Sequence, residues 1–275
     1  MEMNKLQKYN QKLLAAIGTI IAAFGLVGLI VLIVTLISEI SWDRKSNKNS
    51  GLLADEVTEQ LAQENLRQQI LSYDMPRLVD TLNLVYIIPV SQKNLDNPEE
   101  IDEGVLGIMD THPKFGSGKR YSGSRIYGAH NNILIYDYKT QSTIKLFDSR
   151  VFIGNIDTEY FEDDILLVFK GVRFDSDNDG VINLNDYNSL FVYSISKNSL
   201  RELSVTKMDV LAYQFIQDKK DLIIRFGVDR DEDGFYDSKK EPGTLRFYNY
   251  STDTLSKIVP DEINENLQKI IQGSK

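Results

Sequence analysis

The chain of 275 residues has no cysteine and only two histidines. The lack of cysteine excludes disulfides, thiolate metal sites, cysteine nucleophiles and a lipid-modified N-terminal cysteine. Two histidines are too few for a histidine-rich metal site. Oxygen ligands for a metal ion are abundant by contrast, because the chain has 40 Asp and Glu residues.

Positive charge is also scarce. Against the 40 acidic residues stand 31 Lys and Arg, so the net charge is −9. An acidic surface repels phosphate groups, which argues against nucleic acid as a partner. The same acidity is compatible with the binding of cations.

Hydrophobic residues are concentrated in one segment. Residues 13–37 contain no charged side chain, and a helix of this length spans a hydrocarbon core of about 30 Å. The apolar region of a cleaved signal peptide is shorter, about 7–15 residues, so we interpret 13–37 as an uncleaved transmembrane helix. Residues 1–12 are then a cytoplasmic tail and 38–51 a polar linker. We expect the C-terminal domain to be periplasmic or extracellular.

Small residues form a stripe along this predicted helix. Ala15, Gly18, Ala22 and Gly25 recur at spacings of three and four residues. Such stripes allow two transmembrane helices to pack closely. They predict self-association, or association with a protein partner, within the membrane.

The segment after the linker has helical periodicity. Over residues 52–73, apolar side chains recur about every four residues among many Glu and Gln. The pattern predicts a juxtamembrane helix, either in a coiled coil or packed on the following domain.

From residue 82 to 260, short runs rich in Ile, Val, Tyr and Phe alternate with turn residues, which predicts a mainly β domain. Three segments, 133–146, 190–203 and 245–258, superpose without gaps and read as strand, turn, strand. In the last two units an upstream pair of strands, 151–161 with 164–170 and 210–217 with 221–227, completes the repeat. The first unit is degenerate and is expected to draw on 82–130.

Antiparallel four-stranded repeats of this length resemble the blades of β-propellers of the TolB or WD type. About three repeats are fewer than the four to eight blades of closed propellers. The resemblance therefore implies a partial or open propeller, another stack of β-sheets, or a ring completed by other chains. Residues 261–273 follow as a short amphipathic helix, with Asp261 as N-cap and Gly273 as a stop, and we expect it to pack on the sheet.

The most specific motif lies at residues 175–186 and resembles the calcium loops of EF-hand and dockerin proteins. Calcium takes six to eight oxygen ligands, which a twelve-residue loop supplies at alternate positions around a glycine at position 6. Gly180 occupies that position. The flanking segments look like strands rather than the paired helices of an EF-hand. The predicted ligands are Asp175, Asp177, Asp179, the Val181 carbonyl, Asn183 and Asp186.

A second loop, 229–241, follows one repeat later and also resembles thrombospondin type 3 repeats. Its position 12 is Lys240, so completion of the site requires Glu241 to reach in. The first loop is expected to bind one Ca²⁺, and the second could bind another. The predicted ligands of the second loop are Asp229, Asp231, Asp233, Phe235, Asp237 and Glu241.

No catalytic motif accompanies His112 or His130, and ordinary turn positions are the preferred interpretation of both. The first functional hypothesis is a single-pass, membrane-anchored and calcium-binding domain that binds or scaffolds partners in a membrane assembly. The alternatives are an accessory subunit of a membrane transporter or motor, and a hydrolase with its site on the β-domain loops.

Overall fold

The computed structural model describes residues 17–18, 51–54, 57–59, 61, 69–94 and 124–273. The tail at 1–12, the linker up to residue 50 and the segment 13–37, apart from two helical residues, Ile17 and Gly18, lie outside this description. Among the described residues, no helix has the length and apolar character needed to cross a membrane. The chain divides into two compact units, 1–49 and 50–275, and the following account concerns the second.

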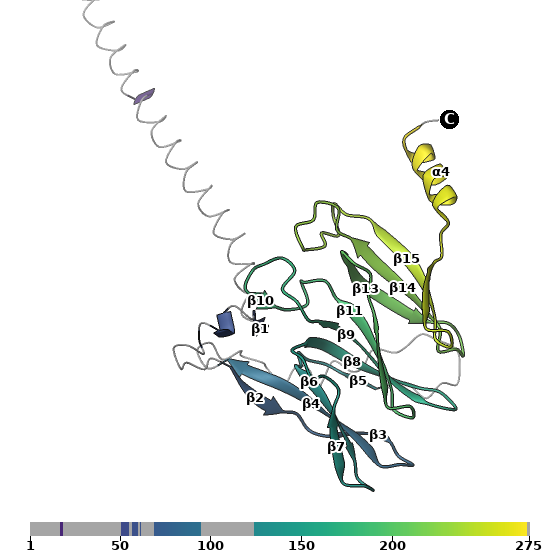
Figure 1. The fold of residues 1–275 in the computed structure, drawn as a ribbon. Helices are drawn as coiled ribbons and strands as arrows, with labels where there is room; N and C mark the ends of the chain where they lie inside the picture. Colours follow the sequence, from purple (N-terminus) through teal and green to yellow (C-terminus); the bar gives the residue numbers. More distant parts are fainter. Residues whose placement is uncertain are drawn as a thin grey trace, which may run out of the picture. The chain divides into compact units, whose positions relative to one another are not determined.

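This second unit is mainly β, with antiparallel sheets and a short C-terminal helix, which is compatible with a propeller-like fold (Figure 1). The first sheet contains β2 (Gln69–Tyr73), β3 (Arg77–Asp80), β4 (Val85–Asn94), β6 (Asn132–Asp137) and β7 (Ser142–Lys145). The central sheet has the order β12-β11-β9-β8-β5, and the last sheet the order β13-β14-β15-β16.

The strands of the central sheet are β5 (Arg125–Ile126), β8 (Phe152–Tyr160), β9 (Ile165–Val172), β11 (Ser189–Ser194) and β12 (Ser199–Leu203). Those of the last sheet are β13 (Met208–Phe215), β14 (Leu222–Val228), β15 (Gly243–Asn249) and β16 (Thr254–Lys257). A separate two-stranded ladder joins β1 (Leu52–Leu53) to β10 (Val181–Ile182).

The three predicted strand-turn-strand segments form the hairpins β6–β7, β11–β12 and β15–β16. Their turns place Gln141, Asn198 and Asp253 at φ values of 54°, 49° and 56°. Such left-handed positions favour short polar residues, which can bond to nearby backbone. Tyr193 and Tyr248 each donate a hydrogen bond of 2.6 Å to the turn residue five positions ahead, which secures two of these turns.

Of two predictions about the first part of the domain, one is wrong and the other is confirmed only in part. The helix expected over 52–73 is replaced at its ends by β1 and β2, although residues 57–59 and 61 are helical. β2 forms because its backbone pairs with β4 through five residues, an interaction that local periodicity does not reveal. The first repeat was expected to draw on 82–130, and β4 from that range does pair with β6. The sheet also includes β2 and β3, which precede residue 82, whereas β5 joins the central sheet.

Two hydrophobic cores hold the three sheets together. One core joins the first and central sheets and includes Ile87, Ile133, Phe169 and Phe191. The other core joins the central and last sheets and has Phe226 among its fully buried residues. Both faces of the central sheet are therefore covered, whereas the first and last sheets each bury one face.

The C-terminal helix α4 (Asp261–Ile271) begins at the residue that was predicted as its N-cap, and Pro260 occupies the N-cap position. Asp261 instead lies in the first turn, where a negative charge is favourable. No residue of α4 is buried, and Ile270 is 65% exposed. The expectation that this helix packs on the sheet is therefore wrong, because its apolar residues lie beyond the last strand.

Candidate metal centre

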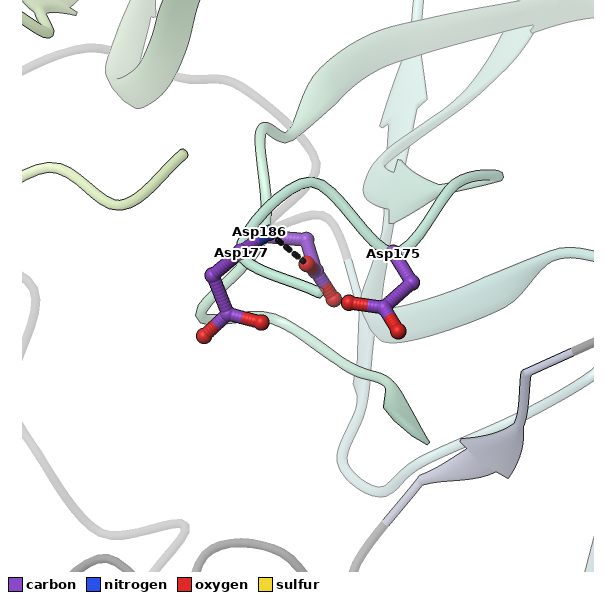
Figure 2. Close-up of side chains that lie close together, drawn as sticks. All are labelled: Asp175, Asp177 and Asp186. Atoms are coloured by element: carbon purple, nitrogen blue, oxygen red, sulfur yellow. Dashed lines mark hydrogen bonds between the residues drawn. The ribbon is translucent and has the colours of Figure 1, made fainter. Parts of the chain in front are cut away.

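The first acidic loop connects β9 to β11 and contains β10. Asp175, Asp177 and Asp186 offer carboxylate oxygens that lie within 4.8 Å of one another. Figure 2 shows the carboxylates of Asp175 and Asp186 turned toward each other, with Asp177 beside them. Asp186 is buried and the other two are half-buried. Three carboxylates from one loop thus converge on a small volume with oxygen donors, the ligand type that calcium prefers.

Backbone hydrogen bonds shape this loop around its first and last aspartates. The Asp175 carboxylate accepts bonds from the N–H groups of Asp179 (3.1 Å) and Gly180 (2.8 Å). The Asp186 carboxylate accepts bonds from the N–H groups of Ser176 (2.7 Å) and Asn183 (2.9 Å). Gly180 has φ +91°, a conformation that glycine adopts at little cost.

The electrostatics of the first loop oppose full ionisation. Desolvation, followed by the charges of Asp179 and Asp186, raises the pKa of Asp177 to about 6. Burial also raises the pKa of Asp186, although backbone N–H groups of Asn183 and Ser176 partly offset that effect. A bound cation would remove this repulsion, because an opposite charge favours the ionised carboxylates.

The second loop connects β14 to β15 and gathers the oxygens of Asp229, Asp231 and Asp233 within 4.8 Å. Asp229 is buried, whereas the other two carboxylates are exposed. Burial opposes ionisation of Asp229, but hydrogen bonds from Tyr187 and from the N–H groups of Gly234 and Glu232 outweigh it, and the pKa is lowered. Desolvation and the neighbouring acidic charges raise the pKa of Asp231.

Glu241 occupies in the second loop the place that Asp186 has in the first. Its carboxylate accepts hydrogen bonds from the N–H groups of Arg230 (2.5 Å) and Asp237 (2.9 Å), at loop positions 2 and 9. Those are the positions of Ser176 and Asn183, which donate to Asp186. The longer Glu side chain thus compensates for the extra residue in the loop.

Lys240, at position 12, does not lie among the aspartates of the cluster. Its ammonium group pairs with the carboxylate of Asp237 at 3.3 Å. One oxygen of Asp237 also accepts the N–H of Lys239 at 2.9 Å.

The remaining predicted ligands play local roles in the loops. Asp179 accepts the N–H of Val181 at 2.9 Å, and Asp233 accepts that of Phe235 at 3.0 Å. Asn183 is buried and accepts the N–H of Asn185 at 2.8 Å. The structure therefore brings three predicted ligands together in each loop and places the others around these two clusters.

The two loops are in direct contact, a feature that the sequence analysis missed. Ser176 donates a hydrogen bond of 2.6 Å to the carbonyl of Gly234, and its hydroxyl also lies 3.1 Å from Asp186. The Tyr187 hydroxyl donates to Asp229. Ser176 and Tyr187 belong to the first loop region and bind the second, so the two acidic clusters share a supporting network. Nothing in the local spacing indicates these contacts.

The first loop is also attached to the N-terminal end of the domain. β1 pairs with β10 inside the loop, and the N–H of Ala54 donates to the carbonyl of Gly180 at 2.9 Å. Gly51 lies so close that an added Cβ would meet the Val181 side chain at 2.3 Å. Gly51 and the residues directly after it thus hold the first acidic loop by its backbone.

His130 is not the turn residue that the sequence indicated. Its backbone bridges to Ile153, its side chain is 2% exposed, and neither ring nitrogen has a hydrogen-bond partner in the described structure. Nδ1 lies 3.4 Å from the Asp74 carboxylate. Burial lowers the pKa of His130, against the attraction of Asp74. His112 lies outside the described residues.

Comparison with models of known protein families and with the curated proteins gives no match.

Proposed function

We propose that this protein is a calcium-stabilised, blade-like β domain that is anchored to a membrane and binds or scaffolds partners outside the cytoplasm. The supporting observation is the pair of acidic loops, which have the same internal hydrogen-bond pattern and lie in successive sheets. The first loop gathers the carboxylates of positions 1, 3 and 12, and the second those of positions 1, 3 and 5. In both loops the last acidic residue, Asp186 or Glu241, accepts the N–H groups of positions 2 and 9. Two acidic loops that share this closing pattern favour a common ligand over solvated turns.

Calcium is the cation that this donor set favours. The donors are carboxylate and carbonyl oxygens, which suit hard cations, and flexible loops tolerate the six to eight ligands of Ca²⁺ better than the strict octahedron of Mg²⁺. The loops connect strands rather than helices, so they lack the helix pair whose opening transmits a calcium signal. We therefore assign the ion a stabilising role.

The anchor and the location are supported by the apolar segment 13–37 and by the affinity expected of such loops. Calcium modules outside cells commonly have Kd values of about 10⁻⁴–10⁻³ M, which match extracellular rather than cytosolic calcium. A binding or scaffolding role fits a domain whose acidic clusters serve stability.

Thermal unfolding of the full chain in detergent tests the calcium assignment. At 10 mM Ca²⁺, Kd values in this range stabilise the folded state by about 1.4–2.7 kcal/mol per site. For a domain of this size, that corresponds to a rise in Tm of about 3–10 °C per site. The same concentration of Mg²⁺ provides the control and should give a smaller rise.

Loop variants then locate the ion. Asp175→Asn should remove the contribution of the first loop, and Asp229→Asn that of the second. Asp148→Asn, at an exposed carboxylate outside both loops, should leave the calcium shift unchanged. If Glu241 completes the second site, Glu241→Gln should reduce its contribution whereas Lys240→Gln should not. A calcium shift that survives both Asp175→Asn and Asp229→Asn would reject the assignment.

A further inference from the structure

The central sheet is packed against another sheet on both faces, and its buried side chains identify each face. The side that faces the first sheet carries Phe191 and Tyr193, which are at most 3% exposed. The side that faces the last sheet carries Val168, Leu190 and Val192, which are at most 1% exposed. Each face of the central sheet is thus marked by particular apolar residues. The repeat places equivalent residues in the first and last sheets.

The first sheet repeats the first of these two surfaces, and none of the described sheets covers it. Tyr136 superposes on Tyr193 and on Tyr248, which is fully buried against the central sheet. Tyr136 pairs in register with Tyr86, and Leu134 with Ile88, so all four point to the same side. All four are half-buried. Elsewhere in the chain the equivalent surface faces the preceding sheet, but among the described residues no preceding sheet covers it here.

The last sheet repeats the opposite surface and also leaves it uncovered. The central pair Val168–Val192 corresponds, 55 residues later, to Ile223–Phe247. Leu245 corresponds in the same way to Leu190. Ile223 is 36% exposed and Leu245 39%, whereas their counterparts are fully buried. Elsewhere in the chain the equivalent surface faces the following sheet, but no sheet in the described part of the chain covers it here.

We propose that a second copy of this chain covers both surfaces, with the last sheet of each copy packed on the first sheet of the other. The contact would continue the sheet-on-sheet packing that occurs twice within the chain, and it rests on the proposed blade-like repeat. Two copies of three sheets make a closed ring of six, within the four to eight blades that such rings contain. A twofold arrangement closes both interfaces at once, as closed symmetry requires.

The absence of cysteine makes this arrangement testable by cross-linking. Leu134→Cys marks the open surface of the first sheet and Leu245→Cys that of the last. The two full-length variants are mixed in detergent, allowed to exchange, and treated with a bis-maleimide that spans about 10 Å, the distance between packed sheets. Asp148→Cys, at an exposed site outside both surfaces, replaces Leu134→Cys in the control mixture. Circular dichroism verifies that each variant is folded.

The expected result is a covalent dimer in the mixture of Leu134→Cys with Leu245→Cys, and at least tenfold less in either variant alone or in the control mixture. A chain that carries both cysteines should stop at the dimer. Cross-linking of either variant to itself, a ladder of larger products from the double variant, or no product in the mixture would overturn the proposal. The cross-linking is performed once with Ca²⁺ and once with a chelator. Because the dimer is tested under both conditions, its presence or absence is judged separately from the calcium assignment.

Discussion

Gly180 and Gly234 occupy position 6 of the two acidic loops, and replacement of each by alanine measures the contact between the loops. Both glycines have positive φ, +91° and +86°. An added Cβ at Gly180 would have its nearest contact at 3.9 Å, on the Val57 side chain. An added Cβ at Gly234 would lie 1.9 Å from the carbonyl oxygen of Ser176, which is a backbone atom that cannot rotate away.

The two variants therefore share the conformational cost of a left-handed alanine, but only Gly234→Ala adds a steric clash. Alanine in a left-handed conformation costs about 1–2 kcal/mol at either position. At Gly234 the loops must also separate, and overpacking of this kind costs a further 1–3 kcal/mol, as an order of magnitude. We expect Gly234→Ala to be less stable than Gly180→Ala by about 1–3 kcal/mol.

Urea denaturation in the presence of a chelator measures this difference without any contribution from a bound ion. With a slope of about 3 kcal/mol per molar urea, the midpoint of Gly234→Ala should lie about 0.3–1 M below that of Gly180→Ala. Equal midpoints would refute the contact, because the first loop would then impose no additional cost on a Cβ at Gly234. A urea midpoint for Gly234→Ala above that of Gly180→Ala would also refute the contact between the loops.

Two further predictions concern His130 and α4. The pKa of His130 is lowered in the folded state, so below about pH 6.5 the unfolded state binds more protons than the folded state. The free energy of unfolding should therefore keep its full value above that pH and fall by up to about 1.4 kcal/mol per pH unit below it. His130→Gln should flatten this part of the urea-measured profile relative to His112→Gln, and an unchanged slope would contradict the burial of a neutral imidazole. A chain that ends after Pro260 lacks α4, which has no buried residue. Its free energy of unfolding, measured by urea titration, should differ from that of the full chain by less than about 0.5 kcal/mol. A larger loss would mean that α4 packs on the domain.

Much of the β domain could be predicted from local sequence because its strands alternate and its turns are marked. The hairpin around Asn198 is an example, since the apolar run before it and the polar turn residue are adjacent in the chain. The clusters around Asp177 and Asp231 were predictable for the same reason: their donors lie within one short loop.

Features that depend on distant contacts could not be predicted in this way. Gln69–Tyr73 carries apolar side chains at spacings that also suit a helix, and only its pairing with β4 selects the strand. Ser176 binds Gly234 across 58 residues, through the packing of two sheets. His130 has polar neighbours in sequence, yet its bridge to Ile153 places it in the interior.

The pairing of β1 with β10 also determines how a mechanical load would enter the domain. Tension that arrives through the residues before Ser50 reaches Gly51, whose carbonyl accepts hydrogen bonds from Gln69 and Gln92. It then reaches Leu52 and Leu53, which are paired with Ile182 and Val181 inside the first acidic loop. An ion that stiffens this loop would therefore strengthen the attachment of the whole domain. Pulling on the N-terminus should rupture this ladder first, at a force that rises when the loop is loaded with calcium.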